Sequence, residues 1–247
     1  MAPTHILITG ANRGLGLGLV RRLLEQPDQT VIAASRNPEN PTSIALAELP
    51  RGPGSRLIVI KYDASIERDP FDVAKKLTEK HGINHLDIVI ANAGIAKSYP
   101  AVKDVHRADI LEHVEVNVLS AVSLYQATRG LLHNSTGNPI FAIMGSGAGA
   151  LGRQPPVPSA VYGASKSMVH WYGVRINSED AWLNTFVLDP GWVQTDMGNT
   201  AAQGWGIESA PDSIDKSCDG MVRVLSTATK EKFGGKVVLY TGEVQAW

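Results

Sequence analysis

The sequence predicts an α/β fold in which one doubly wound domain carries a parallel sheet of about seven strands, with helices on both faces. Short segments rich in valine, isoleucine and leucine alternate with helix-like segments along the chain. Most of the short segments are apolar without alternation, as in strands that are covered on both faces. Strand–helix alternation requires crossover connections and hence parallel strands. Because no repeat or low-complexity linker divides the chain, we expect residues 1–247 to form one domain.

Seven segments read as strands, namely residues 5–9, 30–35, 56–62, 86–92, 139–145, 184–190 and 236–241. Helices are expected between them, over residues 16–26, 71–82, 106–133 and 160–178. The helix at 71–82 ends in lysines, a histidine and a glycine, which is a typical C-terminal signature.

Composition limits the class of protein. The chain is 43% hydrophobic and 19% charged, which is ordinary for a globular protein. A net charge of −1 gives no global field, so we expect neither a nucleic-acid nor a membrane partner. There is one cysteine, Cys218, and no apolar run long enough to span a bilayer, so a cytoplasmic protein is expected. The seven histidines show no ligand spacing, and we expect no metal site.

The stretch "HILITGANRGLG" (5–16) joins the first predicted strand to the first predicted helix through a glycine-rich turn. A helix N-terminus presents unpaired N–H groups and attracts phosphate, and glycine lets a ligand approach the backbone closely. The spacing is G-x-x-x-G-x-G, which differs from the common dinucleotide fingerprint G-x-G-x-x-G. By itself the turn is also compatible with a purely structural strand–helix connection.

Four motifs occur in order along nearly the whole chain: "TGANRGLG" (9–16), "ANAG" (91–94), "YGASK" (162–166) and "PGWVQTDM" (190–197). With them the chain resembles the short-chain dehydrogenase/reductase family, and within it the fungal ketoreductases of the norsolorinic acid reductase kind. The resemblance implies a Rossmann-type fold, a nicotinamide cofactor and chemistry on a carbonyl/alcohol pair.

The cofactor is expected to be NADPH/NADP⁺. Arg13 lies in the glycine turn, and Ser35 and Arg36 follow the second predicted strand, where a cofactor's adenosine ribose would lie. An acidic residue there would repel a 2′-phosphate, whereas arginine offers a fixed charge and bidentate donors. The alternative for either arginine alone is a solvated surface side chain.

The resemblance implies roles for residues of the other motifs. Asp63 would contact the adenine, although it could instead cap a helix that begins near Ser65. Val193 would touch the carboxamide region, and Thr195 would bond the cofactor's amide or phosphates. The cofactor site implied as a whole comprises Gly10, Asn12, Arg13, Gly14, Leu15, Gly16, Ser35, Arg36, Asp63, Asn92, Ala93, Gly94, Tyr162, Lys166, Pro190, Gly191, Val193, Thr195 and Met197.

Tyr162 and Lys166 are candidate catalytic residues because, four apart on a helix, they lie on one face. A nearby ammonium should lower the pKa of the phenol, which can then exchange a proton with a substrate oxygen. Ser146, after the fifth predicted strand, is the candidate that hydrogen-bonds the substrate, the alternative being a serine of a strand-end turn. Asn117 lies within the predicted helix 106–133, where asparagine is unfavourable. The resemblance implies that Asn117 marks a helix distortion whose water connects to Lys166.

Residues 191–211 follow the sixth predicted strand without a helix signal, and long segments of this kind are usually functional. Trp192, Met197 and Trp205 give this segment flat apolar surface. We expect a lid over the substrate, with Trp192, Trp205, Ser146 and Tyr162 contacting it. The alternative is a disordered surface loop whose tryptophans merely pack down.

The function expected from these features is an NADPH-dependent reductase that transfers hydride to the ketone of a bulky apolar or aromatic small molecule, in secondary metabolism. One alternative is an NADPH-binding isomerase or cyclase of a natural-product pathway. Another is a non-catalytic redox-sensing partner protein, against which the complete catalytic set counts. In this family the two long helices commonly pack against their copies, so a homodimer or homotetramer is expected.

Overall fold

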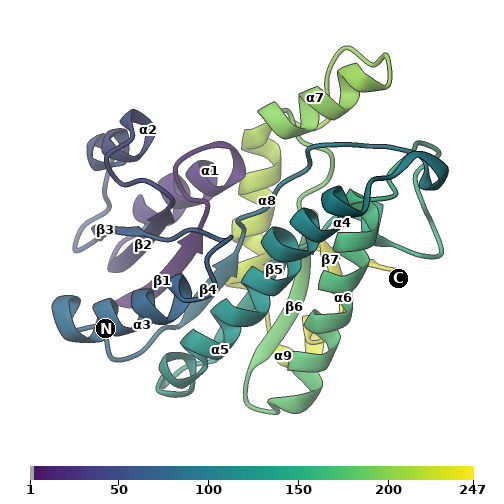
Figure 1. Ribbon diagram of the computed structural model, residues 1–247. Coiled ribbons are helices and arrows are strands. Elements are labelled where there is room, and N and C mark those ends of the chain that lie inside the picture. The colour runs from purple at the N-terminus through teal and green to yellow at the C-terminus, as the bar shows by residue number, and fades with distance from the viewer. Residues whose placement is uncertain (1–2) are drawn as a thin grey trace.

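Eight strands form one sheet in the order β3-β2-β1-β4-β5-β6-β7-β8 in the computed structural model, which describes residues 3–247 (Figure 1). The first seven pair in parallel and only β8 is antiparallel, so the predicted doubly wound sheet is confirmed. The strands are β1 (Thr4–Thr9), β2 (Gln29–Ser35), β3 (Arg56–Lys61), β4 (Ile88–Ala91), β5 (Ile140–Met144), β6 (Asn184–Asp189), β7 (Val237–Leu239) and β8 (Val244–Gln245).

Helices connect the strands and cover both faces of the sheet (Figure 1). The longer ones are α1 (Gly14–Leu24), α3 (Asp69–His81), α4 (Arg107–Val114), α5 (Ser120–His133), α6 (Tyr162–Glu179), α7 (Asp196–Gly204) and α8 (Ile214–Ser226). The shorter ones are α2 (Pro41–Ile44) and α9 (Lys230–Phe233), with 3₁₀ turns at Ala45–Glu48, Val102–Asp104 and Gly147–Gly149 and a π-helical turn at Glu115–Leu119. Within residues 3–247 no helix combines the length and apolarity that a membrane crossing requires.

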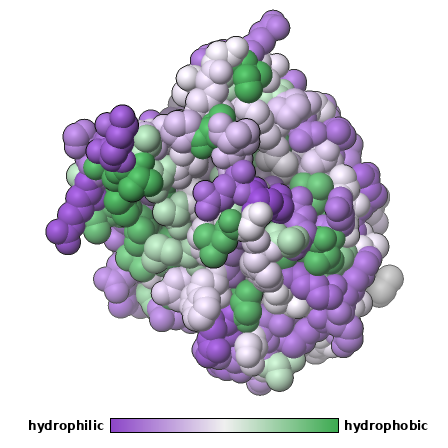
Figure 2. Space-filling model, turned by 90° about the vertical axis from the view of Figure 1, so that its right-hand side faces the viewer, coloured by the Kyte–Doolittle hydropathy of each residue, from purple (hydrophilic) through white to green (hydrophobic). Residues whose placement is uncertain are grey.

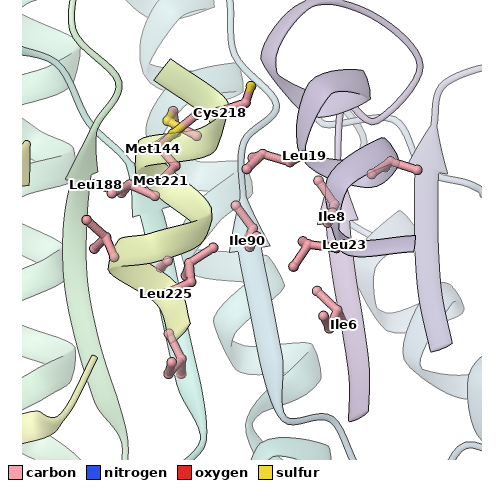
Figure 3. Packing of buried hydrophobic residues seen from close by; sticks show 14 of the residues in the cluster. Ile6, Ile8, Leu19, Leu23, Ile90, Met144, Leu188, Cys218, Met221 and Leu225 are labelled. Atoms are coloured by element: carbon pink, nitrogen blue, oxygen red, sulfur yellow. The ribbon is translucent and has the colours of Figure 1, made fainter. Parts of the chain in front are cut away.

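The core consists of two apolar layers, one on each face of the sheet. On one face α1 and α8 pack side by side, and their leucines and methionine meet residues of the central strands (Figure 3). A Cβ on Gly18 would lie 2.5 Å from Cys218 Sγ, so the close approach of α1 and α8 requires glycine there. On the other face α3, α5 and α6 cover the sheet, and Phe141 and Val89 are fully buried beneath them.

The seven strands and the helices at 16–26, 71–82 and 160–178 were predicted to within two residues at each end. The segment predicted as one helix at 106–133 is continuous but contains the π-helical turn between α4 and α5. Helix α7 was not predicted, and it lies inside residues 191–211, where it stands out from the body of the molecule at the top of Figure 1. Strand β8 was also missed, because two residues carry no pattern.

Parallel pairing brings the carboxyl ends of β1, β4, β5 and β6 to one edge of the sheet. The glycine turn, the "ANAG" segment, the Ser146 turn and the "PGWVQTDM" segment each follow one of these strands. The fold therefore gathers these four segments at the edge where doubly wound proteins bind their ligands.

Candidate active site

The turn between β1 and α1 forms a cradle of backbone. Gly10 has φ +64° and Gly14 φ +52°, which favours glycine at both positions. A Cβ on Gly16 would lie 2.1 Å from the Gly10 carbonyl oxygen, so only glycine fits there. Helix α1 has no side-chain cap and no acidic residue in its first turn, which leaves its N–H groups free for an anion. These features fit a dinucleotide pyrophosphate.

Asn92 holds the end of β4 against this turn. Its Nδ2 donates to the Thr9 carbonyl at 2.8 Å and to the Gly10 carbonyl at 3.3 Å. Thr9 Oγ1 in turn accepts hydrogen bonds from the backbone N–H groups of Asn92 and Ala93, each at 3.0 Å. The "ANAG" segment is thus fixed to the glycine turn by side-chain bonds, as a rigid floor beside the predicted cofactor position.

The two arginines predicted to read a 2′-phosphate are exposed. Arg13 Nη1 lies 3.9 Å from Asp196 Oδ2, and both side chains are largely in solvent, so this pair contributes little. Arg36 makes no ion pair among residues 3–247. Against the effect of burial, the pKa of Asp63 is lowered first by hydrogen bonds from Ser65 and then by the charge of Arg36. Ser35 is buried, and its Oγ is hydrogen-bonded to Ser43 Oγ of α2 at 3.0 Å, so its hydroxyl already has a partner within the protein.

Asp63 makes a local turn. Its Oδ1 accepts from the backbone N of Ser65 at 3.0 Å and from Ser65 Oγ at 2.8 Å. Helix α3 begins only at Asp69, whose Oδ2 accepts from the Asp63 N–H at 2.7 Å. The predicted contact between Asp63 and adenine stays a prediction.

The three predicted reacting side chains come together. Ser146 follows β5 and caps the turn Gly147–Gly149, where its Oγ accepts from the Ala148 N–H at 3.2 Å. Tyr162 begins α6; burial raises the pKa of its phenol, and the nearby Ser146 side chain opposes that rise. Lys166 lies one helical turn further, with its Nζ 5.7 Å from the centre of the Tyr162 ring. A carbonyl oxygen placed between the two hydroxyls would receive hydrogen bonds from both.

The protonation states differ from those expected from the sequence. Burial raises the pKa of Tyr162 well above its ordinary value, so the predicted lowering by Lys166 is not present in this arrangement. Burial lowers the pKa of Lys166 to about 8, against the opposing charge of Asp189. The raised pKa keeps Tyr162 protonated at neutral pH, which is the form that can donate a proton.

Asn117 lies inside the π-helical turn, so the distortion expected there is present. Its Oδ1 accepts from the Ile95 N–H at 2.7 Å, and its Nδ2 donates to the Ile95 carbonyl and to Ser165 Oγ, each at 2.9 Å. Asn117 therefore joins the segment after "ANAG" to α6. The predicted water link to Lys166 stays a prediction.

His113 supports the same segment and was not singled out in the sequence. It is fully buried, and its Nε2 accepts from the Lys97 N–H at 3.1 Å while Nδ1 lies 2.8 Å from the Asp109 carbonyl. His113 precedes Asn117 by four positions, and this spacing on a helix could have indicated that both face one segment.

Four aromatic rings extend from Tyr162 to the segment after β6. The ring centre of Tyr99 lies 6.3 Å from that of Tyr162 and 5.1 Å from that of Trp205. Trp205 lies 5.6 Å from Trp192, whose Nε1 donates to the Gly198 carbonyl at 3.0 Å. Tyr99 was missed because its loop has no periodic pattern. These rings form an apolar wall beside the reacting hydroxyls.

Thr195 connects the lid segment to the glycine turn. Its Oγ1 caps α7 by accepting from the Gly198 N–H at 3.1 Å. A Cβ on Gly14 would lie 3.5 Å from Thr195 Cγ2, so the two segments are neighbours. Val193 is buried, whereas Met197 is exposed. Their predicted cofactor contacts stay predictions.

His5 of β1 lies beside His85 and Asp87, which precede β4, at the opposite edge of the sheet, with ligand atoms within 4.8 Å of one another. The sequence spacing did not indicate this cluster. Asp87 accepts from the His5 N–H at 2.8 Å and from Ser135 Oγ at 2.6 Å, and His5 Nδ1 lies 3.2 Å from the His85 carbonyl. These bonds tie three segments together and account for the arrangement.

Comparisons with known proteins agree with this geometry. The chain is 38% identical over 241 residues to a norsolorinic acid ketoreductase of Dothistroma septosporum, which covers 96% of this chain and 90% of that one. It is 34% identical to the norsolorinic acid ketoreductase of Aspergillus parasiticus, over 96% of this chain and 89% of the relative.

Solved structures of similar fold include the NADPH-bound carbonyl reductase from chicken fatty liver, with a TM-score of 0.86, 24% identity and full coverage of both chains. The carbonyl reductase Sniffer of D. melanogaster aligns with a TM-score of 0.85 at 25% identity, over 99% of this chain and 100% of that one. The profile described as short chain dehydrogenase matches residues 4–204. The glycine cradle, the Ser146–Tyr162–Lys166 arrangement and this match show that the chain belongs to the short-chain dehydrogenase family.

Proposed function

We propose that this protein is an NADPH-dependent reductase of the cytoplasm that converts the ketone of a bulky apolar or aromatic small molecule to an alcohol, in secondary metabolism. The observation that carries the proposal is the grouping of the Ser146 and Tyr162 side chains beside Lys166, at the sheet edge where the glycine cradle lies. The identity to norsolorinic acid ketoreductases supports a ketone as the reacting group.

NADPH supplies the hydride when it is bound. This chain's own residues orient the carbonyl and deliver the proton. The Ser146 and Tyr162 hydroxyls donate hydrogen bonds to the carbonyl oxygen, and Tyr162 transfers its proton to that oxygen as negative charge develops there. The Lys166 ammonium stabilises the phenolate that remains, until solvent returns a proton to it. The balance is one ketone, one hydride and one proton giving one secondary alcohol.

The preference for NADPH over NADH is argued from charge. Arg13 and Arg36 are exposed beside the end of β2 and the glycine turn, and no acidic residue ends β2. Neither arginine is held in a buried ion pair, so both are available to a 2′-phosphate. The similar fold of a carbonyl reductase described as NADPH-bound supports the same choice.

The substrate class is argued from the aromatic wall. Residues 191–211 are proposed to act as a lid, with α7 as its rigid part and Trp205 as its inner surface. The wall of Tyr99, Trp192 and Trp205 offers ring faces and edges to a flat apolar substrate.

The test is a panel of ketones assayed with purified protein by the loss of NADPH absorbance, and repeated with NADH. We expect turnover of aryl and polycyclic ketones with NADPH and much weaker turnover with NADH. A protein that binds NADPH but reduces no member of a broad panel would contradict the proposal and favour a cofactor-binding isomerase.

A further inference from the structure

Asp189, the last residue of β6, places a buried carboxylate at the edge of the sheet where the reacting groups lie. The residue is 2% exposed, and among residues 3–247 it makes no ion pair with lysine, arginine or histidine. An isolated buried carboxylate is costly, so its position calls for a reason. Nothing in the reaction described above uses it.

The carboxylate joins two turns. Oδ1 accepts a 3.0 Å hydrogen bond from the Gly191 N–H, in the turn that follows β6. Gly147, next to Ser146, also lies beside the carboxylate, since a Cβ on Gly147 would lie 3.4 Å from Asp189 Oδ2. The Asp189 side chain thus lies between the turn that carries Ser146 and the turn predicted to face the nicotinamide.

The charged surroundings come from several elements. Helix α6 contributes Tyr162, Lys166 and His170, and the loop before it contributes Arg153. The charges of these side chains act on the carboxylate or on one another. Asp212 and Tyr240 pack against Gly191, since a Cβ on Gly191 would lie 2.7 Å from Asp212 Oδ2 and 2.9 Å from the Tyr240 ring. Asp212 is paired with Lys216 at 3.0 Å, so its charge is already opposed. Burial raises the pKa of Asp189, and the charges of Arg153, which is exposed, and of Lys166, which is buried, oppose that rise.

We propose that Asp189 is a positioning residue of the reductase site: its carboxylate bridges the Ser146 and Gly191 turns and keeps the Lys166 side chain in its charged form. The proposal rests on the proposed function for its catalytic meaning, but the bridge and the charge effect can be measured without turnover. Against the larger effect of burial, the negative charge of Asp189 favours the ammonium of Lys166, and the same charge favours the protonated phenol of Tyr162. Both are the forms required for ketone reduction.

The experiment compares Asp189→Asn and Asp189→Ser with the wild type. Both variants keep an oxygen that can accept from the Gly191 N–H, and both remove the charge. NMR of protein labelled with ¹³C-lysine follows the titration of Lys166, assigned with Lys166→Arg. We expect the pKa of Lys166 to fall by about 1 in each variant, as for the loss of a partly buried opposite charge. The alkaline limb of kcat/KM for ketone reduction should move to lower pH by a similar amount, with kcat lowered more than KM is raised.

The matched control is Asp180→Asn. Asp180 is also a buried carboxylate, but it pairs with Arg129 at 2.6 Å beyond the far end of α6. This variant should lose stability and leave the titration of Lys166 and the pH profile unchanged.

An unchanged Lys166 titration in both folded Asp189 variants would overturn the proposal, as would an equal displacement in Asp180→Asn. Failure of both Asp189 variants to fold would also overturn it, because Asp189 would then be needed for the fold itself. A displaced Lys166 titration in a protein that reduces no ketone would support the charge effect and contradict only the proposed function.

Discussion

The Lys166 ammonium donates a 2.7 Å hydrogen bond to the backbone carbonyl of Met144, the last residue of β5. This bond ties α6 to the strand end that carries Ser146 two residues later. This position leaves Lys166 only 5% exposed, and such burial disfavours its charged form. Lys166 therefore fixes the position of α6 beside Ser146, and its protonation state affects the free energy of unfolding.

The first prediction concerns Lys166→Met and the pH dependence of stability. The pKa of Lys166 falls from 10.5 to about 8 on folding, so between these pH values the unfolded chain binds more protons. The free energy of unfolding of the wild type should then rise with pH across this window, whereas the variant lacks that rise. We expect the difference between the two proteins to change in favour of the wild type by about 2–3 kcal/mol from pH 8 to pH 10.5.

Denaturant unfolding at a series of pH values measures this difference. Lys75→Met serves as the control, because the Lys75 side chain is 65% exposed. A difference between Lys166→Met and wild type that does not change with pH would show that Lys166 is charged throughout the range.

The second prediction concerns cofactor choice. Arg36→Ala should weaken NADPH binding by about 10- to 150-fold, because charge-assisted hydrogen bonds to the 2′-phosphate contribute roughly 1.5–3 kcal/mol. NADH affinity should change little. Titration of both cofactors by fluorescence measures this, with the exposed Arg51→Ala as control. Equal loss of both cofactors would make Arg36 a structural residue.

The third prediction concerns the lid. Trp205→Ala removes a ring that lies 5.1 Å from Tyr99, so an aryl ketone loses part of its stacking surface. The KM for an aryl ketone should rise roughly tenfold or more, and the KM for a small aliphatic ketone should change far less. The small ketone is the internal control. Equal losses on both substrates, or a wild-type preference for small sugar-like carbonyls, would refute the lid assignment.

The fourth prediction concerns assembly. Figure 2 shows hydrophobic side chains gathered in patches on one face of the molecule. On α4 and α6, Leu111, Met168 and Trp171 are 58%, 40% and 65% exposed, which is unusual for large apolar side chains. We expect a dimer or tetramer by light scattering, and a monomer after Trp171→Glu. A monomeric wild type at working concentration contradicts this.

The strands were predictable because their burial on both faces leaves continuous apolar runs, and the order of the motifs fixed which turns meet at the sheet edge. Helix α7 could not be predicted in this way, because most of its residues, 196–204, are polar or small. The helix is held instead by the Thr195 cap and by the hydrogen bond from Trp192 to Gly198. Its apolar contacts come from other segments, which a local pattern does not contain.

The site was predictable where a motif encodes local geometry, as for Tyr162 and Lys166 on one face of a helix. It was not predictable where the environment decides. The sequence suggested that Lys166 lowers the pKa of Tyr162, but burial of both side chains reverses the direction. Tyr99 and Asp189 also carry no local signal, since their roles depend on which loops the sheet brings together.

The most direct test of the account is single-turnover reduction of an aryl ketone by NADPH in the wild type and in Tyr162→Phe, with NADPH affinity measured in parallel. The variant keeps the ring and loses only the proton that is transferred. The account predicts a rate lowered by about 10²–10⁴-fold with NADPH affinity near that of the wild type. An undiminished rate in Tyr162→Phe would contradict it.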